Sequence, residues 1–246
     1  MQRTDPRRRR VRTEPQAPVS EAESRQNCWL CALRARCALA ALLREAGLEG
    51  SVETESVDHA AGSAFEAREG WVCVLRSGTV KVLWNDDARR SRVIDFRFAG
   101  EFVGLDASLG LEPARRGYAT VQWTRLCALR GEPGRPPLPT GLLASRLAAA
   151  ILPVYAHNRM MQAGASERVA AYLVRAYDAL EQGSGWRPGL LPSVARADIA
   201  DYLRLRAESV SRALAQFREA GWIAGKVDSL EVRRADPLRE LAASAR

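Results

Sequence analysis

Three of the five cysteines, Cys28, Cys31 and Cys37, stand within ten residues, with the spacing Cys-x2-Cys-x5-Cys. Thiolates are ligands of zinc and of iron–sulfur clusters, and both kinds of site commonly use four ligands. The triplet is therefore one ligand short of a metal centre, and either Cys73 or Cys127 could complete it. In a reducing compartment, clustered cysteines favour metal binding or redox chemistry over disulfides.

A second group of residues suited to chemistry lies near the C-terminus. Glu208, Ser211 and Arg212 stand at i, i+3 and i+4, so they share one face of a predicted helix. Arginine can donate two hydrogen bonds to guanine, glutamate can accept one from cytosine, and serine adapts to either. The opposite face is apolar and carries Val210, Ala213, Leu214 and Phe217. The alternative is a solvated amphipathic helix with an internal Glu–Arg pair.

Composition narrows the class of protein. The net charge is +8 and the pI is near 9.8, with arginine as almost the only basic residue. This charge is compatible with phosphate contact. The longest apolar run, residues 147–152, is too short to span a membrane, and residues 7–10 precede no apolar stretch of an export signal. We therefore expect a cytoplasmic protein without a membrane partner.

The motifs of the sequence do not favour an enzyme. The sequence contains no glycine-rich phosphate loop and no recognisable nucleophile, base and acid set, and His59 and His157 are isolated. An iron–sulfur redox protein stays open as an alternative of another class.

The elements that must position the cysteines follow from local patterns. Residues 1–20 read as a disordered basic arm, and residues 21–47 as a helical stretch around the triplet that stops at Gly47. Residues 48–135 carry short apolar runs between glycines, which predicts a β-sandwich or roll. Cys73 shares a strand face with Trp71 and Leu75 and is most simply a buried core residue.

A breaker-rich connection, residues 131–139, precedes a predicted helix over residues 141–162 that Pro153 kinks or splits. Its apolar stripe suits a dimer interface; the alternative is a helix packed on its own β-domain. The residues we assign to dimerisation are Leu147, Ile151, Val154 and Met161.

Residues 166–182 predict another helix, and residues 195–203 and 207–220 predict two helices joined by a short turn. Gly221 then ends the last helix, and residues 222–232 read as two short strands. Two helices and a hairpin in this order indicate a winged helix-turn-helix.

At this point the chain resembles a known family. Residues 198–203 and 208–214, together with Gly62, Gly70, Gly78 and the run Gly100-Glu-Phe-Val-Gly104, are similar to the CRP/FNR superfamily of bacterial transcription regulators. The resemblance covers roughly residues 25–240. It implies an α+β fold: an N-terminal β-roll, which is a cyclic-nucleotide-binding-like jelly roll, a long dimerisation helix and a C-terminal winged helix-turn-helix.

The expected domains are a sensor domain over residues 21–137, a dimerisation helix over 138–165 and a DNA-binding domain over 166–240. The sensor domain divides into a cluster-binding segment, residues 25–47, and the β-roll, residues 48–137.

The cysteine spacing and the Glu-x-x-Ser-Arg pattern resemble the FNR branch of the family. This implies a [4Fe–4S] cluster held by Cys28, Cys31, Cys37 and Cys127, with Cys73 left in the core. It further implies a homodimer that binds TTGAT-like palindromes in double-stranded DNA without oxygen, contacts RNA polymerase and responds to oxygen and nitric oxide. The expected DNA-contacting residues are Glu208, Ser211, Arg212, Arg206, Ser209 and Arg204.

Two departures from the family pattern concern Arg204 and Arg206. Arg204 stands where the family often has a turn glycine, and Arg206 stands where it often has a capping Thr or Ser. Each departure costs about 1 kcal/mol of stability, while the added charge favours phosphate contact. The alternative inputs are a structural zinc ion, or a small molecule or cyclic nucleotide near residues 115–117.

Overall fold

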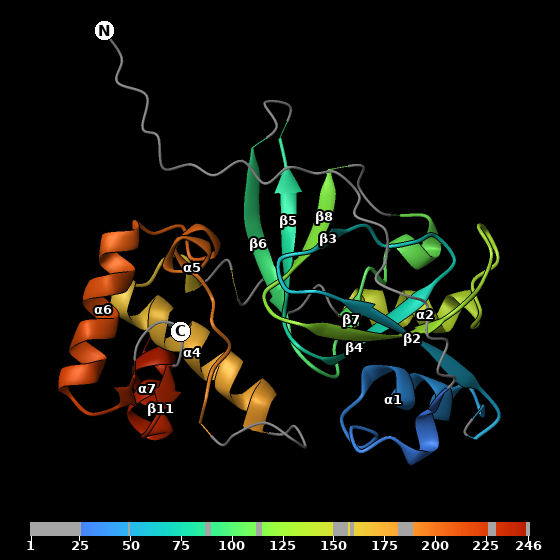
Figure 1. The fold of residues 1–246 in the computed structure, drawn as a ribbon, viewed down its shortest axis with the longest axis horizontal. Helices are drawn as coiled ribbons and strands as arrows, with labels where there is room; N and C mark the ends of the chain where they lie inside the picture. The colour runs from blue at the N-terminus through green and yellow to red at the C-terminus, as the bar shows by residue number, and fades with distance from the viewer. Residues whose placement is uncertain are drawn as a thin grey trace, which may run out of the picture.

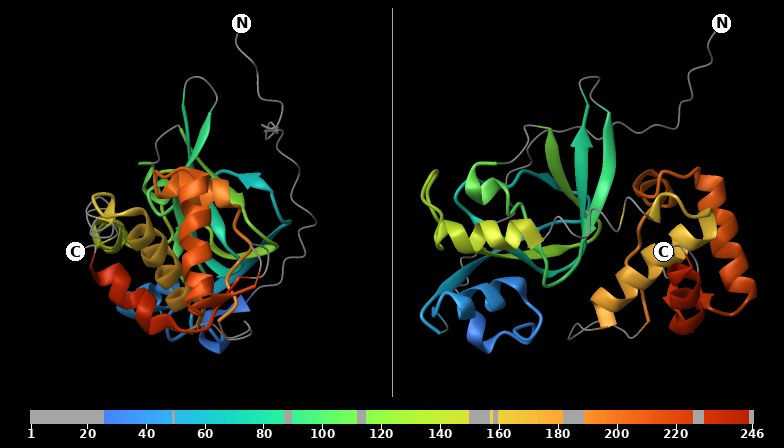
Figure 2. Two further views of the ribbon diagram at one scale, coloured as in Figure 1. Left: turned by 90° about the vertical axis from the view of Figure 1, so that its left-hand side faces the viewer. Right: turned by 180° about the vertical axis from the view of Figure 1, so that it is seen from behind.

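The computed structural model describes residues 26–48, 50–86, 90–111, 115–149, 157, 160–181, 189–225 and 230–244. These residues form a β-roll and a smaller helical domain, which lie side by side in Figures 1 and 2.

The roll consists of two antiparallel sheets. The first has the strand order β1-β2-β9-β4-β7 and the second has the order β3-β8-β5-β6. The strands of the first sheet are β1 (Gln26–Asn27), β2 (Glu53–His59), β9 (Thr124–Leu129), β4 (Val72–Ser77) and β7 (Phe102–Val103). Those of the second are β3 (Ala64–Phe65), β8 (Arg116–Thr120), β5 (Val80–Asn85) and β6 (Ser91–Arg97). The predicted architecture of short antiparallel strands is confirmed.

Alternation along β4 separates the two cores of the sensor domain. Val72 and Val74 face one side of the first sheet, where helix α1 (Ala38–Glu45) packs. Cys73 and Leu75 face the other side, toward the second sheet. Helix α2 (Thr140–Ala149) buries Leu143 in the same core as α1.

The helical domain follows the predicted order. It contains α4 (Ala165–Glu181), α5 (Arg196–Tyr202) and α6 (Ala207–Glu219), and then the hairpin strands β10 (Ile223–Ala224) and β11 (Glu231–Val232). The chain then forms α7 (Ala235–Ala243), which packs on α4 and which sequence patterns did not indicate. The five predicted core positions of α4 are all buried: Val169, Tyr172, Leu173, Ala176 and Leu180.

The two domains share one hydrophobic core. Val93, Phe96 and Phe98 from the β6 edge of the roll belong to the same buried cluster as Tyr172 of α4 and Tyr202 of α5. Figure 1 shows β6 as the strand of the roll that lies beside the helical domain. Within the described ranges, no helix has both the length and the apolar character needed to cross a membrane.

Candidate functional site

The cysteine triplet lies in a turn-rich segment, so our prediction of a continuous helix around it is wrong. Cys28 opens the 3-10 turn η1 (Cys28–Leu30), and Cys37 is the N-cap of α1. Successive turns join Cys31 N to Cys28 O (3.3 Å) and Arg34 N to Cys31 O (3.0 Å). A straight helix rotates by 100° per residue and would place Cys37 on the side opposite Cys28. The turns instead allow all three thiols to face one place.

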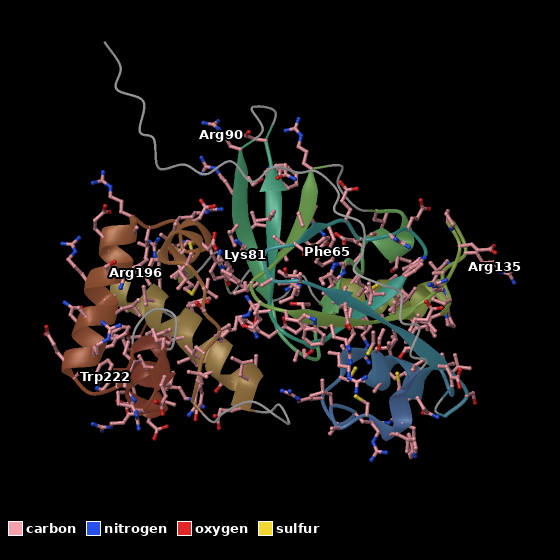
Figure 3. All side chains as sticks on the ribbon, viewed as in Figure 1. Phe65, Lys81, Arg90, Arg135, Arg196 and Trp222 are labelled. Atoms are coloured by element: carbon pink, nitrogen blue, oxygen red, sulfur yellow. The ribbon has the colours of Figure 1, made fainter. Side chains whose placement is uncertain are left out.

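Cys127 joins these three in a single pocket. The pocket is lined by Asn27, Cys28, Cys31, Cys37, Leu39, Ala40, Thr54 and Cys127. Cys127 reaches it from β9, where it pairs with Val74 of β4 and therefore shares that residue's face. Cys73 faces the opposite side of the same sheet. We call this site the four-cysteine pocket; Figure 3 shows yellow sulfur atoms gathered beside α1.

The electrostatics of the pocket favour neutral thiols unless cations are bound. Burial raises the pKa of the Cys28 and Cys37 thiols and raises that of Cys127 to about 12. At Cys37 the backbone N–H groups of Leu39 and Ala40 oppose this rise in pKa, since they donate hydrogen bonds to the sulfur. Bound metal ions would reverse the balance, because their positive charge stabilises thiolates.

Buried polar atoms beside the pocket suit an anionic, sulfur-rich group. Ser56 Oγ and Arg76 Nη1 are buried and have no hydrogen-bond partner among the described residues. Ser56 lies opposite Cys127 in the β2–β9 register, and the positive charge of Arg76 lowers the pKa of Cys28 and Cys127. A cluster with four thiolates carries negative charge and accepting sulfurs that these two groups can meet.

A single metal ion and a [4Fe–4S] cluster require different spacings of four thiols. Within the described part of the chain, no three Cys, His, Asp or Glu side chains converge closely enough to hold one metal ion. Around one zinc ion, with Zn–S bonds of about 2.3 Å, four sulfurs stand only about 3.8 Å apart. In a [4Fe–4S] cluster each cysteine binds a different iron, so the sulfurs stand farther apart. Among the described residues, the four thiols thus share one pocket without standing close enough together to hold one ion.

The interior of the roll is filled by side chains. Leu75, Val80, Val82, Val103, Tyr118 and Leu126 form its buried core. Phe65 stacks on His59 and on Tyr118, with ring centroids 4.4 and 5.5 Å apart. A cyclic nucleotide near residues 115–117 is one of the alternative inputs. Arg116, within this stretch, donates a hydrogen bond to the carboxylate of Asp106. The side chain of Arg116 is thus engaged by a carboxylate of the same domain.

The second candidate site is the outer face of α6. Its inner face buries the four predicted residues, Val210, Ala213, Leu214 and Phe217. Glu208 and Arg212 are exposed and Ser211 is half-buried. Arg212 Nη2 lies 3.5 Å from Ser209 Oγ, so two of the predicted DNA-contacting residues are adjacent on this face. The structure shows no tertiary contact that would occupy Arg212 within the described residues.

The turn before α6 has both predicted departures. Arg204 adopts φ +52°, which is the left-handed region that favours glycine. Arg206 is the N-cap of α6 and makes no side-chain capping hydrogen bond. Both side chains are exposed beside the N-terminal end of α6. The charge of both residues therefore faces solvent near the polar surface of α6.

The predicted dimerisation residues divide between the two cores. Leu147 of α2 packs against the core around α1, and Met161 packs against the core of the helical domain. Ile151, Val154 and the expected kink at Pro153 lie outside the described residues. The first part of the predicted helix thus contacts its own sensor domain.

Contacts between the two domains were not predicted from the sequence. Lys81 Nζ pairs with Asp198 Oδ2 at 2.9 Å, and Figure 3 shows Lys81 at the junction between the roll and the helical domain. Arg175 of α4 donates to Asp95 Oδ1 (2.7 Å) and to Phe96 O (2.9 Å). These residues are far apart along the chain, so no local spacing signals them.

Comparison with known proteins agrees with this architecture. A family model described as "Crp-like helix-turn-helix domain" matches residues 167–241. The "Nitrogen fixation regulation protein FixK" of Rhizobium meliloti is 30% identical over 171 residues, which cover 68% of this chain and 76% of that protein. The "Fumarate nitrate reduction regulatory protein" of Klebsiella oxytoca is 26% identical over 186 residues, covering 70% and 71%.

Solved structures show the same fold. FixK2 from Bradyrhizobium japonicum matches 77% of this chain and 98% of its own, with a TM-score of 0.60 at 19% identity. A CRP/FNR family transcriptional regulator from Thermus thermophilus matches 78% and 100%, with a TM-score of 0.61 at 19% identity.

A β-roll joined to a winged helix-turn-helix with a solvent-facing polar second helix defines a DNA-binding transcription regulator rather than an enzyme. With the FixK relative at 30% identity, the chain belongs to the CRP/FNR family of transcription regulators.

Proposed function

We propose that the chain is an oxygen-responsive member of this family that holds a [4Fe–4S] cluster in the four-cysteine pocket. The observation that supports it most is that Cys28, Cys31, Cys37 and Cys127 line one pocket, while Cys73 faces away. When bound, such a cluster supplies the sensitivity to oxygen, and to nitric oxide, on which the response depends.

The residues around the pocket have distinct parts in this proposal. The four thiols bind the irons, and the N-terminal N–H groups of α1 stabilise the Cys37 thiolate. Thr54, whose Oγ1 lies 3.8 Å from Cys28 Sγ, orients that ligand. The unpartnered Arg76 Nη1 offsets negative charge.

The output is DNA binding as a homodimer in the cytoplasm. Glu208, Ser211 and Arg212 read the bases of TTGAT-like half-sites, and Arg204, Arg206 and Ser209 contact the backbone. The chain from residue 138 to 165 pairs the two copies, and the dimer contacts RNA polymerase.

The test is anaerobic purification with iron, sulfide and zinc assays. We expect about four irons and four sulfides per chain and a visible absorbance that air removes. Cys127→Ala should lose this absorbance, whereas Cys73→Ala, a matched change one strand away, should keep it. Zinc without sulfide in the wild-type protein would contradict the proposal and leave the DNA-binding function standing.

A further inference from the structure

Arg36 connects the cysteine segment to the DNA-binding domain. It directly precedes Cys37, yet its Nη1 donates a hydrogen bond of 2.7 Å to the carbonyl oxygen of Ala179 in α4. The two residues are 143 positions apart in the chain. The contact therefore joins the edge of the four-cysteine pocket to the helix on which the DNA-binding domain is built.

The carbonyl oxygen of Ala179 is not used by the hydrogen bonds of the helix itself. Ala179 lies in the last turn of α4 (Ala165–Glu181), where carbonyl groups have no partner within the helix. That turn contains no basic residue of its own. The partial negative charge at a helix C-terminus attracts a cation. Arg36 supplies to α4 both the missing donor and the missing charge.

The backbone of Arg36 is held tightly on the sensor side. Ala38 N donates to Gly100 O at 2.8 Å, and Cys37 N donates to Leu33 O at 2.9 Å. Gly100 has φ +96°, and a Cβ there would lie 3.0 Å from Arg36 O. A displacement of Cys37 therefore moves Arg36 relative to the roll and to Ala179.

Apart from this contact, little offsets the burial of the polar atoms of the Arg36 side chain. Its Nε is buried and has no partner among the described residues. The side chain is half-buried, so its placement has a desolvation cost. The contact is thus easily lost when the segment that presents it moves.

We propose that Arg36 is a positioning residue that transmits the occupancy of the four-cysteine pocket to the DNA-binding domain of the same chain through Ala179 O. The inference rests on the proposed cluster site. With Cys37 ligated, Arg36 is held against the end of α4. With Cys37 unligated, the turns of residues 28–37 lose their anchor and α4 loses this contact.

The consequence for DNA binding follows from the place of α4. Through Arg175 this helix also contacts Asp95 and Phe96 of the roll. Arg36 adds a second attachment to the sensor domain about one turn further along the helix, at Ala179. Losing it removes one of the contacts that fix the orientation of the DNA-binding domain, so a dimer must use part of its binding energy to order the two domains.

The test compares three purified full-length variants on a palindrome of TTGAT-like half-sites, cluster-loaded and after air exposure. Arg36→Ala should keep the cluster absorbance and the dimer mass. Its cluster-loaded form should bind DNA about tenfold more weakly than the loaded wild-type protein, the size expected for one charged hydrogen bond. The air-exposed forms should bind alike, so the loaded-to-exposed affinity ratio falls.

Arg36→Lys, which keeps a cation and N–H donors, should restore most of that ratio. Arg34→Ala is the matched control, because Arg34 lies in the same loop, while its guanidinium donates to Trp29 O and stacks on the Trp29 ring. It should keep the wild-type ratio.

A wild-type ratio in Arg36→Ala with its cluster intact would overturn the proposal. If that variant retains too little cluster to measure, Arg36→Gln takes its place. Loss of cluster absorbance in all three Arg36 variants would assign the residue to cluster retention and also overturn it. A wild-type protein without sulfide would instead contradict the proposed cluster.

Discussion

The side chain of Arg212 is exposed to solvent, while buried neighbours hold its backbone in place. It projects from the second turn of α6, while Val210, Ala213 and Leu214 anchor the same turns in the core. Its neighbours Glu208 and Ser211 complete a donor and acceptor set suited to base edges. Its guanidinium has a weak contact of 3.5 Å with Ser209 Oγ, so leaving that contact for guanine costs little free energy. The burial of the neighbouring residues thus limits where Arg212 can reach.

Arg212→Ala should abolish specific binding to the palindrome while leaving the dimer intact. A bidentate contact to guanine contributes about 1–3 kcal/mol of discrimination per half-site, and a dimer uses two half-sites. The measurement is a titration of palindromic and scrambled DNA, with mass by light scattering. Arg239→Ala removes the same charge from α7, where Arg239 pairs with Asp178, and should bind normally. Wild-type-like binding by Arg212→Ala would disprove the readout assignment.

At the scale of elements, the start of α6 has arginines at two positions where other residues would be more stable. The N-terminal N–H groups of a helix need acceptors, and Arg206 at the N-cap cannot accept. Arg204, two residues earlier, holds a left-handed conformation at φ +52°. Both residues add a cation where a phosphate would approach the N-terminus of the helix. We therefore expect this turn to lower local stability and to raise affinity for DNA.

Arg206→Ser should stabilise the domain by about 1 kcal/mol, since a serine at the N-cap can accept from a free N–H of the first turn. Urea unfolding followed by tryptophan fluorescence measures this gain. The same variant should bind all DNA sequences more weakly, and its slope of log affinity against log salt should fall by about 1.8, which is about 0.9 for the phosphate contact of each protomer. An unchanged salt slope would show that Arg206 does not contact a phosphate.

Elements with strong periodicity were predictable from the sequence. The stripes of α4 and α6 set their buried faces, and Gly221 ends the last turn of α6 with φ +70°. The strand face of Cys73 followed from alternation in β4. Helix α7 was missed because its short apolar pattern gains its stability from packing on α4.

The candidate site was only partly predictable. Spacing and resemblance indicated the four cysteines, but the helix expected around them is replaced by turns. Nothing local indicates that Ser56 and Arg76 lie beside the pocket, because strand register and a β-bulge place them. The Arg36–Ala179 contact joins parts of the chain that only the tertiary fold brings together.

At the scale of the whole molecule, aromatic and charged residues form the junction that joins the two domains. Phe96 of the roll packs against Tyr202 and Tyr172, with ring centroids 5.3 and 5.4 Å away. Burial alone would raise the pKa of Asp95, but the charges of Arg97 and Arg175 hold that pKa below its ordinary value. The junction therefore contains a carboxylate that is charged at neutral pH and neutralised by arginines.

His157 makes this junction sensitive to pH. Its ring lies 4.7 Å from that of Tyr202, and its Nδ1 is buried without a partner among the described residues. Burial holds the pKa of His157 below its ordinary value of 6.5; Asp95 opposes this, and Arg175 and Arg204 add to it. The folded state thus favours the neutral ring. Stability is fully present above about pH 6.5 and falls as the pH drops below it, because the unfolded chain then binds the proton more readily.

We therefore expect the free energy of unfolding of the wild-type protein to fall between pH 7.5 and 5.5, and that of His157→Gln to fall less. His59, the other histidine, is also buried and has a lowered pKa, so the difference between the two proteins isolates His157. Urea unfolding at several pH values measures that difference. A gap between wild type and His157→Gln that stays constant over this range would show that His157 protonates equally in both states, and that the junction does not respond to pH through this ring.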